Sequence, residues 1–352
     1  MVTPELATMF SGNQDELVEH FGMLTRILDG RGFQSDTGAH GRRGYSGDYY
    51  FTWIGAVIDI PHRVWRLLGN LGPKIYFFRL PEDAKIGKEK LEQIKKMLKA
   101  NSYLSKLKSS QDAIKELWSN IVNRPGKVDG KIIWDKNRDD EETLDRIVEI
   151  SMVLANLRGI MPTWQTRDPD SGGSMYNFET PIIEDPSRAS SAFYNLARGH
   201  AVICGRNYII KEDLCVIIPT ALSSAPKERV DLFRLLIENG GKLNTSQFME
   251  SARVSRATAL KEMESLCHLG LVEKTEEDSS TKPIKVIKLK EQFNWFLTPE
   301  FMRYWNEFKY SLIPQMSKLS DDSDEENLNK RGLGERLNAF FEDNESNGDS
   351  KY

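Results

Sequence analysis

Residues 226–290 carry the pattern that most restricts how this chain can fold. A helix is predicted for "PKERVDLFRLLIENGG", which two glycines end, and a shorter one for "NTSQFMESA". A third helix, "SRATALKEMESLCHLG", begins with Ser255 as its N-cap and ends at Gly270. Two strands, "LVEK" and "IKVIKLK", then flank the polar loop "TEEDSSTKP". Three helices, a compact turn before the third and a hairpin indicate a winged helix-turn-helix.

Basic side chains at the third of these helices favour double-stranded DNA as a partner. The segment 226–290 holds 12 Lys and Arg against 10 acidic residues, a modest excess for a nucleic-acid reader. Arg253, Arg256 and Lys261 stand at the start and on the outward face of the third helix, where helix-turn-helix proteins contact the major groove. The loop 274–283 carries acidic residues, which phosphates repel. Two interpretations stay open: DNA binding through the third helix, or a winged helix used for protein contacts.

Two apolar segments near the N-terminus predict buried strands. The first is "YYFTWIGAVIDIP", and the second is "PKIYFFRLP" at 73–81, which prolines bracket. Helices are predicted at 14–28 and 62–69, and the glycine-rich stretch 36–49 is expected to be a loop. Strands alternating with helices suggest a parallel α/β sheet, but two strands are too few to complete one.

The middle of the chain is predicted to be mainly helical. Residues 82–124 are Lys-rich with apolar stripes, which favours a solvated helical insertion, and 141–162 form an amphipathic helix. The stretch 163–183 predicts a small hairpin or an irregular loop. A further helix begins at Asp185–Pro186, with Arg188 in its first turn, and the next helix has Glu212 and Asp213 at its start, where the helix dipole favours acids.

The order of these parts resembles the second half of an AAA+ ATPase module of the MoxR and minichromosome-maintenance type, followed by a winged helix. "VTPEL" stands where the Walker B strand ends, and "ILDGRGFQSDTG" looks like the end of a helix and the pre-sensor hairpin. "WIGAVIDIP" is similar to the sensor-1 strand and "NLGPKIYFFRLP" to the arginine-finger segment. "DPSRASSAFYNLARGHAVICGRNYIIKEDL" matches the sensor-2 helix and the segment after that helix. The resemblance covers roughly residues 1–220.

The resemblance assigns roles to four residues. Glu5 matches the Walker B glutamate that polarises the attacking water, although the preceding aspartate that helps hold magnesium is missing. Asp59 falls where sensor 1 usually has a polar amide, and Lys74 takes the place of the arginine finger without its planar fork. Arg188 alone matches without substitution, as the sensor-2 arginine that reaches the β- or γ-phosphate of ATP.

Each of these residues also has a structural interpretation. Arg188 could simply pair with Glu184 or Asp185 in the first turn of its helix. The other three could be structural or degenerate remnants of the ancestral site.

The phosphate-binding loop of such a module is missing from the sequence. No G-x-x-x-x-G-K-[ST] is present, and "GGKLNTS" at 240–246 has the wrong spacing. The resemblance therefore implies ATP and Mg²⁺ as cofactors only if a P-loop half complements this chain. A P-loop-containing subunit or a homo-oligomeric ring is a possible partner. The chain alone is expected to be inactive as an ATPase. The alternative is a non-enzymatic DNA-binding or adaptor protein with a degenerate ATPase remnant.

The expected organisation is mixed α/β and α, with four parts. Residues 1–81 are a partial AAA+ α/β core, and 82–222 are a helical insertion with the lid. Residues 223–316 are a winged helix with its packing helix, and 317–352 are a disordered acidic tail. The net charge of −4 argues against strong nonspecific attraction to nucleic acid. No membrane span and no signal peptide are recognised, so a cytoplasmic protein is expected. A bacterial or phage origin is what the AAA+ resemblance implies.

Cysteine and histidine spacing predicts no metal site. The three cysteines are widely spaced, and the five histidines form no HxxxH pattern. The cysteines are expected to be buried, reduced thiols. They are Cys204, Cys215 and Cys267.

Overall fold

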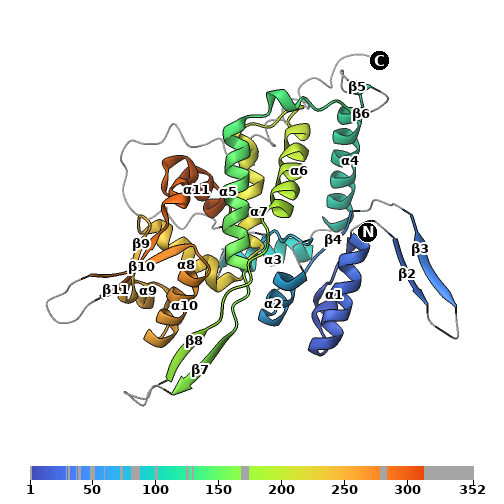
Figure 1. The fold of residues 1–352 in the computed structure, drawn as a ribbon. Coiled ribbons are helices and arrows are strands. Elements are labelled where there is room, and N and C mark those ends of the chain that lie inside the picture. Colours follow the sequence, from blue (N-terminus) through green and yellow to red (C-terminus); the bar gives the residue numbers. More distant parts are fainter. Residues whose placement is uncertain are drawn as a thin grey trace, which may run out of the picture. The chain divides into compact units, whose positions relative to one another are not determined.

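The computed structural model describes residues 2–312 apart from 29, 31, 37, 39–40, 48–51, 59, 72–73, 81–87, 100–101, 124–126, 129–130, 168–173 and 278–283. It is a mixed α/β protein, mostly helical, with small sheets (Figure 1). The chain divides into two compact units. The first joins Met1–Arg79 to Lys106–Met302, and the second joins Leu80–Ser105 to the residues from Arg303 onward. The tail expected at 317–352 lies outside the described residues.

The N-terminal segment of the first unit is built on two helices and short strands. Strand β1 (Val2–Thr3) pairs in parallel with β4 (Ile54–Gly55), and β2 (Gly32–Asp36) forms an antiparallel hairpin with β3 (Arg42–Ser46). The hairpin corrects the expectation of a loop at 36–49. Gly38 and Gly41, between the two strands, adopt positive φ, which allows the chain to turn back on itself. The parallel pairing of β1 and β4 spans only two residues.

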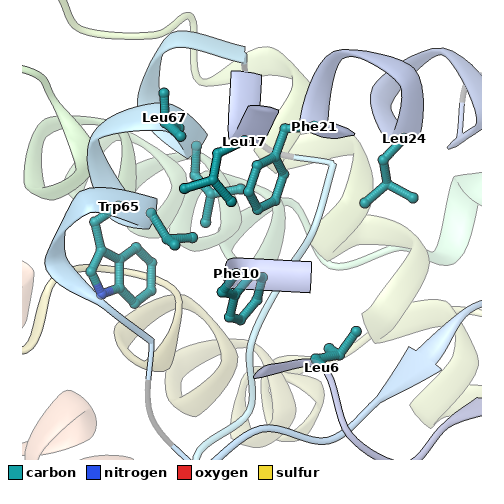
Figure 2. Close-up of a cluster of buried hydrophobic side chains, with 9 residues drawn as sticks. Leu6, Phe10, Leu17, Phe21, Leu24, Trp65 and Leu67 are labelled. Atoms are coloured by element: carbon teal, nitrogen blue, oxygen red, sulfur yellow. The ribbon is translucent and has the colours of Figure 1, made fainter. Parts of the chain in front are cut away.

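A compact hydrophobic core holds this segment together. Helices α1 (Gln14–Leu28) and α2 (His62–Leu71) pack against each other, and a 3₁₀-helix (Ala7–Phe10) lies beneath them. The rings of Phe10 and Phe21 stack with their centroids 5.9 Å apart (Figure 2). The core consists of buried aliphatic and aromatic side chains: Leu6, Phe10, Leu17, Phe21, Leu24, Val64, Trp65, Leu67 and Leu68.

The strand predicted at 73–81 does not form. Residues 74–80 have no strand pairing, although the segment is partly buried. Its backbone instead bonds a side chain of the helical part, because the Phe77 N–H donates to Ser224 Oγ at 2.8 Å and Ser224 Oγ lies 3.2 Å from the Phe77 carbonyl oxygen. The apolar residues that suggested a strand serve packing, with the rings of Trp65 and Phe77 5.3 Å apart.

Three helices form the centre of the first unit. Helices α5 (Glu141–Arg158), α6 (Ser187–Ile203) and α7 (Leu214–Ser223) run side by side (Figure 1). Helix α5 begins where the Asp140 carboxylate accepts a hydrogen bond from the Thr143 N–H, and it ends at Gly159, before the predicted stop at Pro162. Strands β7 (Thr163–Arg167) and β8 (Ser174–Phe178) form an antiparallel hairpin, so of the two expectations for 163–183 the hairpin is confirmed.

The Lys-rich stretch predicted to be helical contains two helices, and a short hairpin comes after it. Helix α3 spans Lys88–Lys99 and helix α4 spans Ser102–Val122. Strands β5 (Lys127–Val128) and β6 (Lys131–Ile132) form the antiparallel pair.

Residues 226–297 contain three helices and a three-stranded antiparallel sheet. The helices are α8 (Lys227–Glu238), α9 (Thr245–Ala252) and α10 (Arg256–His268). The sheet has the order β10–β11–β9, from Val272–Glu277, Ile284–Leu289 and Lys242–Asn244. The sequence analysis missed β9 because it is only three residues long. A 3₁₀-helix (Glu291–Leu297) and α11 (Pro299–Leu312) complete the described chain.

Candidate functional site

The start of α10 presents two arginines to solvent. Arg253 ends α9 in a left-handed conformation, with φ 53°, and Ser255 begins α10 by accepting a hydrogen bond from the Thr258 N–H at 3.2 Å. Arg253 and Arg256 are both exposed. The opposite face of α10 is anchored in the core by buried side chains, Ala259, Met263 and Leu266. The buried face of α10 thus packs in the core, while Arg253 before the helix and Arg256 in its first turn are accessible.

Lys261 occupies a different environment from these two arginines. Its Nζ lies 5.5 Å from the ring centroid of Tyr176 in β8, and its side chain is 34% exposed. Further along the helix, the ring of His268 lies 4.9 Å from that of Phe178. The β7–β8 hairpin thus covers the flank of α10 that carries Lys261 (Figure 1). Arg253 and Arg256 are both exposed next to the start of α10, whereas Lys261 lies against the hairpin.

The acidic residues after α10 belong mainly to a strand. Strand β10 continues through Glu277, so residues 274–277 are not the loop that the sequence analysis assigned to them. Lys274 makes a 3.0 Å salt bridge to Glu264 of α10, which fixes the strand to the helix.

Arg188 lies in the first turn of α6 and is exposed. The capping acid of this turn is Asp185, whose Oδ1 accepts a hydrogen bond from the Ser187 N–H at 2.8 Å. Within the part of the chain that the structure describes, the Arg188 guanidinium makes neither a hydrogen bond nor a salt bridge. The pairing of Arg188 with Asp185 or Glu184 that the sequence left open is therefore not formed.

Glu184 faces a different arginine, in the interior. Its Oε1 lies 3.9 Å from Nε of Arg158, the last residue of α5, and the Arg158 side chain is only 1% exposed. Among the described residues, no hydrogen bond reaches the guanidinium nitrogens of Arg158 or the carboxylate oxygens of Glu184. Burial raises the pKa of Glu184 to about 7, although Arg158 and Arg188 both act to lower it.

The segment predicted to carry an arginine finger lies beside this buried pair. The Tyr76 ring packs 5.3 Å from that of Phe193 in α6. Burial raises the pKa of Tyr76 to about 12, while the nearby charges of Arg158 and Arg188 oppose this rise. Residues from three separated parts of the sequence thus meet here, with Arg188 at the exposed rim.

The end of α5 is also joined to the helices of the C-terminal region. Arg229 of α8 donates hydrogen bonds to the carbonyl oxygens of Leu157 (2.7 Å) and Gly159 (2.6 Å). A Cβ added to Gly159 would lie 2.6 Å from Cδ2 of Leu269, the C-cap residue of α10. The backbone next to Arg158 therefore contacts both α8 and the end of α10.

The remaining predicted catalytic residues make local structural contacts or lie outside the described residues. Glu5 is exposed, and its Oε1 accepts a hydrogen bond from the Ala7 N–H at 2.9 Å. The Lys74 ammonium donates to the carbonyl oxygen of Thr25 in α1 at 3.0 Å. Asp59 lies outside the described residues.

A buried polar cluster that the sequence does not predict surrounds Asp213. Asp213 is fully buried, and its carboxylate accepts two hydrogen bonds from Arg206 (2.7 and 2.8 Å) and one from the Ile210 N–H (2.9 Å). His200 Nδ1 lies 2.6 Å from Asp213 Oδ1. The hydrogen bond to Asp213 is the main cause that raises the pKa of His200 to about 10. Burial raises the pKa of Asp213, but Arg206 and His200 outweigh it and lower the pKa.

Two cysteines adjoin the same histidine. The sulfurs of Cys204 and Cys215 each lie 3.7 Å from His200 Nε2. All three cysteines are free, but the prediction that they are buried is wrong for Cys204, which is exposed, and for the half-buried Cys215 and Cys267. No group of three or more His, Cys, Asp or Glu side chains is arranged to hold a metal ion among the residues described above.

Comparison with protein-family models, curated proteins and solved structures found no match to this chain. None of the described helices has the length and hydropathy that crossing a membrane requires. A function can therefore be inferred only from the chain's own topology and side chains.

Proposed function

We propose that this chain binds double-stranded DNA through a winged helix-turn-helix and is the C-terminal part of an AAA+-type ATPase that couples nucleotide state to that contact. The observation that carries the DNA part is the element order α8–β9–α9–α10–β10–β11 with sheet order β10–β11–β9. A helix, a short strand, two helices and a hairpin that pairs back on the short strand are the expected parts of a winged helix. In this assignment α10 is the recognition helix.

The charges on the accessible end of α10 support DNA as the ligand. Arg253 and Arg256 stand where recognition helices contact DNA, and both are exposed. Their guanidinium groups can donate to phosphates or to the O6 and N7 acceptors of guanine. Lys261, in contrast, would contribute only if the β7–β8 hairpin moved or contacted DNA together with it.

The nucleotide part of the proposal rests on Arg188. Among the described residues, the exposed Arg188 guanidinium makes neither a hydrogen bond nor a salt bridge. Its place in the first turn of a helix suits it to meet a phosphate that approaches the helix N-terminus. The sequence contains no P-loop, so ATP and Mg²⁺ would bind only with a P-loop half that a different polypeptide supplies. Arg188 would then sense the phosphates, and hydrolysis would depend on that complement.

A direct path for coupling runs through the end of α5. Glu184 lies close to both Arg158 and Arg188, so a phosphate on Arg188 would change the electrostatic balance of the buried pair. The next residue after Arg158, Gly159, lies against Leu269 and accepts a hydrogen bond from Arg229. A shift at Arg158 would thereby reach α8 and the end of α10.

A gel-shift comparison tests the DNA part. The native protein and Arg256→Glu are titrated against duplex DNA at moderate salt, with Lys115→Glu as a control, since Lys115 is exposed in α4 and its substitution reverses the charge in the same way. We expect weaker binding by Arg256→Glu and unchanged binding by the control. Unchanged affinity of Arg256→Glu would remove α10 from the proposal.

Thermal unfolding with and without ATP and Mg²⁺ tests the nucleotide part. A ligand that binds the native state raises Tm, so the chain alone should show no shift, because it lacks the backbone amides of a P-loop. A clear rise in Tm would show that this chain binds nucleotide by itself and would contradict the dependence on a P-loop half.

A second candidate function is a non-enzymatic DNA-binding or adaptor protein. The contacts of Glu5 with Ala7 and of Lys74 with Thr25 favour it, because both predicted catalytic side chains already serve local structure. In that case the α/β segment is scaffold, and addition of a P-loop half would produce no ATP hydrolysis.

A further inference from the structure

The cluster around His200 contains an arrangement that the proposed DNA-binding function does not use. One imidazole nitrogen, His200 Nε2, lies 3.7 Å from the sulfur of Cys204 and 3.7 Å from the sulfur of Cys215. Because both sulfurs contact the same nitrogen atom, the distance between the two sulfurs is at most twice 3.7 Å. Cys204 is the C-cap residue of α6, and Cys215 lies in the first turn of α7.

The histidine that joins the two thiols is fixed in place. Its other ring nitrogen, Nδ1, is bonded at 2.6 Å to the fully buried Asp213, which Arg206 holds with two further hydrogen bonds. Asp213 favours the imidazolium form of His200, so Nε2 carries a proton that it can donate toward either sulfur. A cation held beside a thiol is the environment in which cysteines react as nucleophiles.

The two thiols differ in access, which gives them different roles. Cys204 is exposed and is followed by Gly205, whose φ of 87° ends the helix in a turn. Cys215 is only partly exposed and lies in the next helix. A small oxidant from solvent meets Cys204 first, and Cys215 is placed to react with the oxidised sulfur.

We propose that Cys204 and Cys215 are a peroxide-sensitive thiol pair that closes to an intramolecular disulfide between α6 and α7. The Cys204 thiolate attacks one oxygen of hydrogen peroxide, the O–O bond breaks, and hydroxide leaves as the sulfur becomes a sulfenic acid. The Cys215 sulfur then attacks Cys204 Sγ, the S–O bond breaks, and a second hydroxide leaves. Each hydroxide takes up one thiol proton, so two thiols and one peroxide give one disulfide and two water molecules.

The third cysteine supplies an internal control. Cys267 lies in α10, and burial raises its pKa to about 11, which disfavours the thiolate. It should therefore stay reduced at a peroxide concentration that oxidises the other two.

Thiol titration and peptide mapping of the full chain test this proposal. After reduction and removal of reductant, hydrogen peroxide should lower the free thiols from three to one per chain and yield one peptide pair that links Cys204 to Cys215. Cys267→Ser should form the same disulfide, and Cys204→Ser should form none. In Cys215→Ser, dimedone should label a sulfenic acid at Cys204.

A histidine variant tests the part played by His200. His200→Gln should oxidise more slowly than the native protein at neutral pH, while circular dichroism reports an unchanged fold. If His200→Gln loses its fold, the cysteine variants still test whether Cys204 and Cys215 form the disulfide. Retention of all three thiols by the native protein, or a disulfide that includes Cys267, would overturn the proposal.

Discussion

Arg158 Nε lies 3.9 Å from Glu184 Oε1 in the interior of the protein. Among the described residues, neither side chain of this buried ion pair makes a hydrogen bond. Such a pair is costly, because the desolvation of both groups is repaid only when further hydrogen bonds satisfy them. The pair lies between the exposed Arg188 and the contacts that Leu157 and Gly159 make with α8 and the end of α10, so a substitution there tests whether these parts are coupled.

Glu184 should make the stability of the protein depend on pH. Its folded-state pKa is about 7, above the ordinary value of 4.5. The stabilisation that the folded protein gains from protonated Glu184 is therefore fully present below pH 4.5 and is lost as the pH rises through 7. Glu184→Gln removes this titration. Urea unfolding should show that the native protein loses stability relative to the variant between pH 4.5 and 7, and parallel pH profiles would contradict the assignment.

Asp213 should be among the most sensitive positions of the chain. Asp213→Asn keeps the shape but leaves the buried charges of Arg206 and His200 without their counter-charge, which we expect to cost about 3–5 kcal/mol of unfolding free energy. Asp231→Asn is the control, since its partner Lys227 is largely exposed and such a pair contributes about 0–1 kcal/mol. Equal losses in urea unfolding would show that the cluster does not stabilise the fold.

His200 should titrate far from its ordinary range. Its pKa of about 10 means that the imidazolium contributes stability that is complete below pH 6.5 and lost as the pH rises through 10. NMR titration of the ring proton resonances gives this pKa directly. A midpoint near 6.5 would show that the bond to Asp213 does not hold the proton on His200.

Two glycines should respond in opposite ways to alanine. At Gly159 the new Cβ would lie 2.6 Å from Leu269 Cδ2, so Gly159→Ala should destabilise the protein by about 1–3 kcal/mol. Gly199, inside α6, has no atom within 4 Å of an added Cβ, and Gly199→Ala should stabilise by about 0.5–1 kcal/mol. Thermal unfolding of both variants checks the sign of each effect.

Helices were the part of the fold that the sequence predicted well. Apolar periodicity and local capping residues define them, and the helix predicted at 14–28 agrees with α1. Short strands were missed or misplaced, because two- and three-residue strands such as β4 and β9 depend on distant partners. The segment 74–80 shows the same limit: its apolar residues predict burial, but the side chain of Ser224, at the end of α7, takes the place of a strand neighbour.

Some residues of the candidate site could likewise be predicted from the sequence, and others could not. Arg253 and Arg256 were predictable because an N-cap serine locates the start of α10. Asp213 was interpreted as a first-turn acid favoured by the helix dipole, since the sequence does not show that Arg206 and His200 fold back onto it. Arg158 gave no signal at all, because an arginine in the last turn of a helix ordinarily faces solvent.

The most direct test of DNA binding through α10 is the salt dependence of affinity. Fluorescence anisotropy with a labelled duplex would compare the native protein with Arg253→Gln/Arg256→Gln across a series of salt concentrations. If both arginines contact phosphates, the double variant should bind more weakly, and the slope of log K against log salt should fall in magnitude by about 2. An affinity and a slope equal to those of the native protein would contradict DNA binding at the start of α10.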